Sequence, residues 1–364
     1  MLFEEIIGND ELKRLLPQMV REGRLPHAVL FTEEGCWGAM AFALALAQYV
    51  NCERNTAPAT PSMFGDAEPA TPAEDACGTC DSCHKYGKLI HPDLHFVFPV
   101  AASKSLSESE KKAPVSDYFL ESFRQLVLAN PYFGEEDLYD AIEIDNKNGI
   151  ISANEAKRLF EKLSLRAFEG RYKTVIIYLP EKMNQDAANK LLKLLEEPPA
   201  GTLFLLVSHA PERIISTIRS RCQHIRLHPL SKEERAKAGV ATRVRPEYRE
   251  LLMQLFNAGM AKSVIDTFPI WESVSDMGRE RQKEWCLYAE SFIRKIYMTA
   301  SSMESLADLE EDEAGTVRNL AARIKPGFYE TAFKALEGAV ASVESNVNPK
   351  LTFCNLCNIL LLAM

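Results

Sequence analysis

The sequence predicts an α/β domain at the N-terminus, followed by an all-helical C-terminal region. Short apolar segments at 27–31, 173–178 and 202–208 have the length and composition of buried strands, and helical patterns separate them. A glycine-containing turn follows the first of these strands and leads into an apolar helix, as at the start of nucleotide-binding α/β units. After His228 the strand signals stop, and helical patterns fill the rest of the 364 residues.

The elements of the N-terminal domain follow from hydrophobic spacing and from turn residues. The expected helices are 2–25, 39–50, about 154–165 and 181–197, with a short one beginning at Pro211. The expected strands are 27–31, 173–178, 202–208 and 223–227. Pro198 and Pro199 end the helix 181–197, since proline cannot continue a helix.

Two segments interrupt this alternation. Residues 52–95 contain four cysteines and a stretch rich in proline, alanine and threonine at 56–76, which cannot bury a core and is predicted to be a flexible loop. Residues of about 99–150 form an extra insertion that is polar at first and then helical. The sequence assigns no purpose to this insertion.

The composition is ordinary for a globular protein. Hydrophobic residues make up 46% of the chain and charged residues 26%, and the formal net charge is −9. This acidic total argues against stand-alone DNA binding, because neutralisation of phosphates dominates that affinity. The N-terminal segment lacks the pattern of a signal peptide, and no apolar run reaches the roughly 20 residues that span a bilayer. We therefore expect a cytoplasmic protein whose nine cysteines serve as metal ligands and core residues rather than in disulfides.

Four cysteines have the spacing of a metal site. Cys52, Cys77, Cys80 and Cys83 give the pattern C-x24-C-x2-C-x2-C. Four thiolates close a tetrahedral zinc site with no open position, so we predict one structural zinc ion per chain without a catalytic role. His84 can replace one ligand, but four cysteines suffice. The alternative is a loop with reduced, unpaired thiols.

The glycine turn corresponds to a phosphate-binding loop that lacks most of its functional residues. A working loop reads G-x4-G-K-[ST], with amides and lysine for the phosphates and a hydroxyl for magnesium. Here Glu33 stands at the first glycine, Gly38 at the second, Ala39 at the lysine and Met40 at the hydroxyl position. Because Glu33 and Glu34 would repel phosphate, we interpret the segment as a structural turn and expect no bound ATP.

The acidic residues of an ATPase are also missing. Functional P-loop ATPases carry Asp, often followed by Glu, at the end of a buried strand to hold magnesium and orient water. Here the strand 173–178 leads into Tyr178 and Leu179 at these positions. Glu181 lies beyond them and is expected to cap the following helix, where a carboxylate suits the positive helix end. Two independent parts of the ATPase machinery are thus absent together.

Three segments together resemble the clamp-loader branch of the AAA+ family. They are LPHAVLF with its glycine turn, EKMNQDAANKLLKLLEEPPAGTLFLLVS at 181–208, and TIRSRCQHIRL at 217–227. The middle segment is long and specific, and the resemblance covers about 1–52, 77–97 and 150–228. It implies a RecA-like AAA+ domain at 1–228 with a zinc module within 52–95. The family also has a small helical lid and an all-helical collar domain. Residues 229–262 are too short and too charged for the full lid, so we expect a reduced lid or linker there and the collar domain at 263–364.

Within this family the missing lysine and acids favour the delta-prime type of DNA polymerase III subunit over the ATP-hydrolysing motor type. The resemblance implies a role for Arg221, which with Ser220 and Cys222 forms the motif Ser-Arg-Cys. Arg221 would reach the γ-phosphate of ATP held by the adjacent motor subunit, because its guanidinium is always charged and matches phosphate oxygens. The implied partners are the motor (gamma/tau) and delta subunits, with the sliding clamp and primed DNA contacted through the complex.

Two other functions remain open at this point. An active ATPase with an unusual nucleotide site is disfavoured by the missing lysine. A zinc-dependent nucleic-acid-binding module is disfavoured by the acidic total and by the scarcity of basic residues around the cysteines. Arg221 taken alone is no more than a surface charge. Cys354 and Cys357 form another Cys-x2-Cys pair, but they lie in a predicted apolar helix, so we interpret them as core residues.

Overall fold

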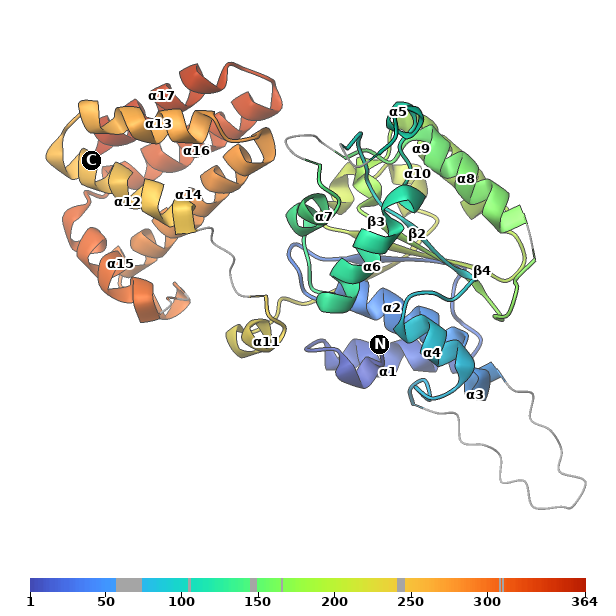
Figure 1. Ribbon diagram of the computed structural model, residues 1–364. Coiled ribbons are helices and arrows are strands. Elements are labelled where there is room, and N and C mark those ends of the chain that lie inside the picture. Colours follow the sequence, from blue (N-terminus) through green and yellow to red (C-terminus); the bar gives the residue numbers. More distant parts are fainter. Residues whose placement is uncertain are drawn as a thin grey trace, which may run out of the picture. The chain divides into compact units, whose positions relative to one another are not determined.

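Five parallel strands form the sheet of the N-terminal part of the computed structural model (Figure 1), in the order β2-β3-β4-β1-β5. The strands are β1 Ala28–Thr32, β2 Leu94–Val97, β3 Lys173–Tyr178, β4 Thr202–Ser208 and β5 Gln223–Arg226. All residues of β1, β3 and β4 are buried, as expected for a parallel sheet that is covered on both faces. The structure describes residues 1–56, 74–103, 106–144, 149–164, 166–240, 246–307, 309 and 311–364.

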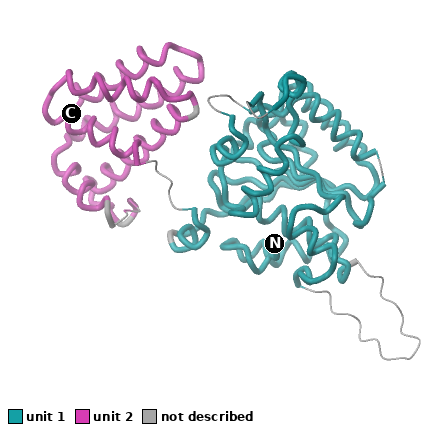
Figure 2. The backbone as a smooth tube through the Cα atoms, viewed as in Figure 1, with its two compact units in different colours: residues 1–241 teal, residues 242–364 magenta. Residues whose placement is uncertain are grey.

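The described chain divides into two compact units, residues 1–241 and 242–364 (Figure 2). The first unit is α/β and the second is helical. This confirms the predicted order of an α/β domain followed by an all-helical region. The boundary between the two units falls inside the segment 229–262, which is predicted to be a reduced lid or linker. Most of the flexible loop predicted at 56–76 lies outside the described residues.

Alternate strand residues point to opposite faces of the sheet and build two cores. Val29 and Phe31 pack with α2 Ala39–Val50 on one face, whereas Ala28 and Leu30 pack with α8 and α9 on the other. Figure 1 shows α1, α2 and α4 on one side of the sheet and α8 and α9 on the other. The remaining helices of this unit are η1 Phe3–Glu5, α1 Asp10–Arg21, α3 Glu53–Thr56, α4 Asp81–Gly87, α8 Ala153–Ser164, η3 Pro180–Lys182, α9 Gln185–Glu196, η4 Pro211–Arg213, α10 Ser216–Arg219 and α11 Lys232–Lys237, besides those of the insertion.

The parallel register brings three chain segments to one edge of the sheet. Thr32 at the end of β1 pairs with Ser208 at the end of β4, and Tyr178 at the end of β3 pairs with Val207. In open parallel sheets the carboxyl ends of the strands form the ligand-binding edge. The segments that begin at Glu33, Leu179 and His209 therefore lie next to one another.

Two predicted helices are divided in the structure. The segment 2–25 contains η1 and α1, since Gly8 and Asn9 have φ angles of 73° and 51° and interrupt the helix between them. The segment 181–197 contains η3 and α9. Asn184 caps α9 by accepting a hydrogen bond from the amide of Ala187 at 2.8 Å. The expectation that Glu181 caps this helix is wrong, because its carboxylate accepts hydrogen bonds from the amides of His209 and Ala210 instead.

The insertion packs on the α2 face of the sheet. Its described helices are α5 Glu108–Lys112, η2 Ser116–Phe119, α6 Leu120–Ala129 and α7 Glu135–Ala141, and an isolated antiparallel bridge between Val100 and Ile150 joins its ends. Phe123 of α6 stacks on Phe98 with the ring centroids 4.2 Å apart. The buried carboxylate of Glu155 in α8 accepts a hydrogen bond from the amide of Ser116 at 2.7 Å. The predicted helical part of the insertion is thus an integral part of the first unit.

The second unit is a helical bundle with an aromatic core. Its helices are α12 Pro246–Ala261, η5 Ile265–Thr267, α13 Phe268–Ser275, α14 Arg279–Ala300, η6 Glu304–Leu306, α15 Glu311–Arg323, α16 Gly327–Glu344 and α17 Pro349–Ala363. Trp285, Phe292 and Phe353 are almost fully buried in this core, and Cys357 is buried with them. None of the helices in the described parts of the chain is both long and apolar enough to cross a bilayer.

Candidate functional site

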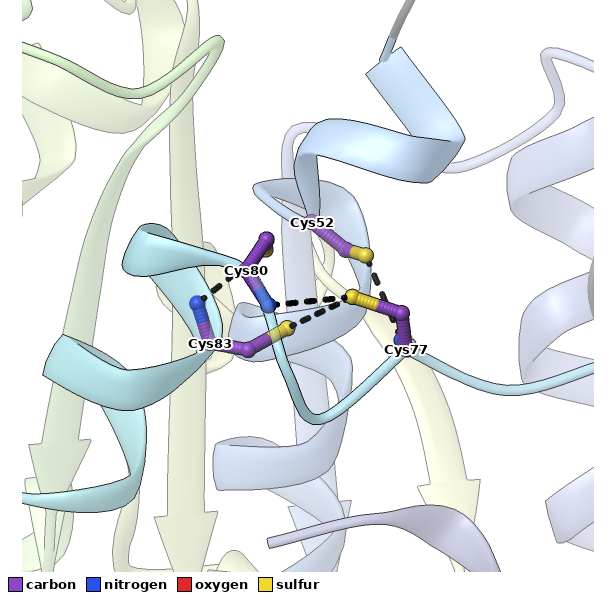
Figure 3. Close-up of side chains that lie close together, drawn as sticks. All are labelled: Cys52, Cys77, Cys80 and Cys83. Carbon is purple, nitrogen blue, oxygen red and sulfur yellow. Dashed lines mark hydrogen bonds between the residues drawn. The ribbon is translucent and has the colours of Figure 1, made fainter.

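The four predicted cysteines form one cluster (Figure 3). Cys52 follows α2, Cys77 lies in the loop before α4, Cys80 is the N-cap of α4, and Cys83 lies in its first turn. Their sulfur atoms all lie within 4.8 Å of one another. The sulfur atoms of Cys77 and Cys83 are 3.9 Å apart, close to the roughly 3.8 Å expected between two ligands at the 2.3 Å Zn–S distance of a tetrahedral site. The arrangement therefore fits a metal ion such as zinc.

Backbone amides donate hydrogen bonds to three of these sulfur atoms, those of Cys52, Cys77 and Cys80, and such bonds favour negative charge. The amide of Cys77 donates to the sulfur of Cys52 at 3.3 Å, and the amides of Cys80 and Cys83 donate to the sulfur atoms three residues before them at 3.4 Å. A hydrogen bond with Cys83 lowers the pKa of the Cys52 thiol to about 4, and the same hydrogen bond raises the pKa of the Cys83 thiol. A thiolate is the form that binds a metal.

Polar side chains fix the cluster to the sheet, and the sequence analysis missed them. The amide of Tyr172, next to β3, donates to the side chain of Asn51 at 2.8 Å. Asn51 donates to the hydroxyl of Tyr86 at 2.6 Å, and this hydroxyl lies 2.9 Å from the hydroxyl of Thr174 in β3. Because Asn51 precedes Cys52, and Tyr86 lies in the same helix as Cys83, these bonds hold the cysteine-bearing segments against β3.

Glu33 is the central residue at the carboxyl edge of the sheet. Its side chain is only 3% exposed. One carboxylate oxygen accepts hydrogen bonds from the amides of Trp37 at 2.7 Å and Ala39 at 3.0 Å. The other oxygen lies 3.1 Å from Nε2 of His209. These two amides stand at the N-terminus of α2, where backbone groups point outward and the helix dipole favours an anion.

The other residues of this loop follow the predicted register. Gly38 has a φ of 104°, which favours glycine, and it is the residue before α2. Ala39 and Met40 are buried in the first turn of α2 and carry no polar side-chain atom. Tyr178 is buried at the end of β3 and donates a hydrogen bond from its hydroxyl to the carbonyl of Phe133 at 3.2 Å. Leu179, at the second predicted acid position, is also buried.

His209 belongs to the same group, although the sequence analysis did not identify it. Burial lowers its pKa, but the hydrogen bond and the charge of Glu33, with the charges of Glu181 and Glu135, more than offset this effect. The pKa of His209 is therefore raised above its ordinary value of 6.5. The available signal was the position of His209 directly after β4, in register with the end of β1.

Arg221 lies between α10 and β5 and forms a separate group. One guanidinium nitrogen donates to the carboxylate of Glu196 at 2.5 Å, and another donates to the carbonyl of Thr217 at 3.0 Å. The hydroxyl of Ser220 donates to the same carbonyl at 3.1 Å. Cys222 packs against the α8–α9 core, and burial raises the pKa of its thiol to about 11. Since Glu196 ends α9, the ion pair joins two of the three segments that carry the family resemblance.

Comparison with known proteins gives the family. A family model described as "DNA polymerase III, delta subunit" matches residues 8–231. The delta-prime subunit of DNA polymerase III from Bacillus subtilis is 28% identical over 244 residues, which are 67% of this chain and 55% of that protein. The Escherichia coli delta-prime subunit is 40% identical over 209 residues, or 57% of this chain and 43% of that protein. The tau subunit of Escherichia coli is 25% identical over 234 residues, or 64% of this chain and 26% of that protein.

The matched segments span about half of the length of these relatives, or less. The family match lies within the first unit, which contains the parallel sheet, the cysteine cluster, Glu33 and Arg221. It covers more than half of the chain. The chain therefore belongs to the DNA polymerase III delta-subunit family, and its predicted resemblance to the delta-prime subunits is confirmed.

Proposed function

We propose that the chain is a non-hydrolysing subunit of the bacterial DNA polymerase III clamp loader, with an AAA+ fold. It assembles with the motor (gamma/tau) and delta subunits and helps to load the sliding clamp onto primed DNA. Membership of the delta-subunit family supports this role. The proposal has three parts: a vestigial nucleotide site, an arginine offered to a neighbouring subunit and a structural zinc ion.

The position of Glu33 is the observation that carries the proposal. In a working phosphate-binding loop, backbone amides at the start of the helix bind phosphate oxygens. Here two amides of that loop donate to the buried Glu33 carboxylate, so an anion from the chain itself takes their hydrogen bonds. Ala39, Met40 and Tyr178 supply neither the lysine nor the magnesium ligands. A site of this kind neither retains nor hydrolyses ATP.

The surroundings of Arg221 suit an arginine that acts on another subunit. Its side chain is 35% exposed and that of its partner Glu196 is 48% exposed. An exposed ion pair contributes about 0 to 1 kcal/mol. Exchange of Glu196 for a phosphate therefore costs little, and the fork of donors can then stabilise charge at the γ-phosphate of the neighbour's ATP.

A zinc ion in the cysteine cluster has a structural role in this proposal. Four cysteine ligands leave no position for water or substrate, so the ion supplies no catalysis. Cys52, Cys77, Cys80 and Cys83 would hold it. The ion would connect the end of α2 to the loop before α4, across the long segment that separates the first two cysteines.

Reconstitution tests this function. The purified chain, mixed with motor and delta subunits, is expected to elute with them as one complex that loads the clamp onto primed DNA. The chain alone is expected to show no ATP turnover above background. Failure to join the complex would overturn the proposal, and turnover by the isolated chain at the rate of a motor subunit would show instead an active ATPase.

A further inference from the structure

We propose that residues 130–135 of the insertion are an internal plug that closes the vestigial phosphate-binding loop. The plug is defined as the segment from Asn130 to Glu135, between α6 and the start of α7. It follows from contacts within the first unit, and it depends neither on the role of Arg221 nor on assembly with other subunits. It gives a purpose to an insertion whose sequence contains no functional motif.

The first contact is made by Tyr132 and covers the glycine of the loop. A Cβ atom added to Gly38 would lie 2.8 Å from the Tyr132 ring, so the ring rests directly on this backbone. Tyr132 is only 9% exposed. Its hydroxyl accepts a hydrogen bond from the amide of Ile7 at 2.7 Å, which connects it to the N-terminal segment. The ring therefore occupies the space above the turn that leads into α2.

The second contact is made by Phe133 at the end of β3. Its carbonyl accepts the hydrogen bond from Tyr178, and the two ring centroids are 4.9 Å apart. Burial raises the pKa of Tyr178 well above its ordinary value, so its hydroxyl stays protonated and remains a donor. The ring of Tyr178 in turn meets His209 edge to face at 5.5 Å. Phe133 thus fills the space beside the positions where an ATPase carries its acidic residues.

Further bonds hold the plug at both ends. Asn130 donates to the carbonyl of Ala238 at 3.1 Å and accepts a hydrogen bond from the amide of Tyr132 at 2.9 Å. At the other end, Lys182 pairs with Glu135 at 2.5 Å, and both side chains are at least three-quarters buried. A Cβ atom on Gly134 would lie 3.5 Å from the sulfur of Cys36 in the loop. The plug therefore touches the segments after β1 and β3 and is anchored outside them.

The consequence is a loop closed by two layers of the same chain. Glu33 takes the hydrogen bonds of the amides from within, and Tyr132 and Phe133 cover the loop and the strand end from outside. Nucleotide phosphates then find neither free loop amides nor open space beside the end of β3. Substitution of the loop residues alone does not recreate a nucleotide site while the plug remains in place.

Hydrogen–deuterium exchange on the full chain tests the plug. Tyr132→Ala is expected to accelerate exchange of the loop amides 36–40 at least tenfold, while exchange in the strands β3 and β4 stays unchanged. Tyr118→Ala is the matched control, because Tyr118 lies in the same insertion but is 39% exposed and contacts Arg158. Unchanged loop exchange in Tyr132→Ala would overturn the proposal.

Two further variants keep the test decisive if Tyr132→Ala does not fold. Tyr132→Phe removes only the hydroxyl that accepts from Ile7, and it is expected to accelerate loop exchange about threefold; no change would contradict the plug. A chain with Glu33→Gly, Ala39→Lys and Met40→Thr restores the loop residues. With the plug intact, it is expected not to bind a fluorescent ATP analogue with magnesium at micromolar concentration, and binding would overturn the proposal.

Discussion

Glu33 differs from an ordinary surface carboxylate because it accepts hydrogen bonds from backbone amides at the start of α2. The amide of Ala39 lies at the buried start of α2 and donates to Glu33, whereas the amide of Trp37 donates both to Glu33 and to the carbonyl of Gly35 at 3.0 Å. Removal of an acceptor leaves a buried donor unsatisfied, which costs about 1 to 3 kcal/mol for each group. Because the Ala39 amide loses this acceptor, Glu33→Ala is expected to lower the free energy of unfolding by about 1 to 3 kcal/mol, measured by urea denaturation.

The neighbouring Glu34 provides the control for this prediction. Its side chain is 67% exposed and pairs with the exposed Arg226. Glu34→Ala should change the free energy of unfolding by about 0.5 kcal/mol or less, as is usual for exposed positions. Equal effects of the two substitutions would mean that the Glu33 hydrogen bonds do not stabilise the loop.

His209 makes the stability of the first unit depend on pH. Its pKa in the folded chain is raised above 6.5, because the interactions with Glu33, Glu181 and Glu135 more than offset burial. The stability that protonated His209 contributes is then fully present below its unfolded pKa and is lost as the pH rises through its folded pKa. In urea denaturation at several pH values, wild type is expected to lose this advantage over His209→Gln above pH 6.5. An advantage that grows with pH would contradict the pairing.

At the scale of elements, the segment between α2 and β2 depends on its cysteines. Besides α3 and α4 it contains no helix or strand among the described residues, so a metal bound by the cysteines is expected to stabilise it. We expect one zinc ion per chain by elemental analysis, and we expect Cys80→Ser to lose the zinc and to unfold at lower urea concentration. Cys354→Ser, in α17, should keep the metal. Wild-type chain without zinc would refute the site.

The sequence predicted elements whose signals are local. The strands β3 and β4 were located to the residue, because each is a continuous apolar run rich in β-branched or leucine side chains. The strand β2 was missed, because it has only four residues and is defined by pairing with β3. The role of Glu181 was also predicted wrongly, because it too depends on residues distant in the sequence. Its hydrogen-bond donors are the amides of His209 and Ala210, which follow β4.

In the candidate site, too, residues with a local sequence pattern were predicted and contacts between distant residues were not. Regular spacing located the cysteines, and the register after β1 located Glu33 and Gly38. The contact of Glu33 with His209 joins residues 176 positions apart, and the contacts of Tyr132 depend on how an insertion without any motif folds back. Such pairs follow from the three-dimensional arrangement and carry no local pattern.

At the scale of the whole molecule, the candidate site residues lie in one of the two units. The first unit contains every candidate site residue and the whole family match, so the proposed chemistry is confined to it. The second unit offers a helical bundle with an apolar core and exposed apolar side chains such as Ile265, Leu351 and Leu362. The helical class of this unit was predictable from the loss of strand signals after His228.

The most direct measurement is the DNA-stimulated ATPase rate of the assembled loader that contains Arg221→Ala. Arg226→Ala is the matched control, because Arg226 is an exposed arginine of the neighbouring strand that pairs with Glu34. An arginine supplied in trans can raise the rate at one site by about 10³ to 10⁵. We predict that Arg221→Ala assembles normally and that the total ATPase rate of the loader falls by the fraction contributed by the one ATP site next to Arg221. Arg226→Ala is expected to keep the wild-type rate. Full activity of an assembled Arg221→Ala loader would contradict the proposed role.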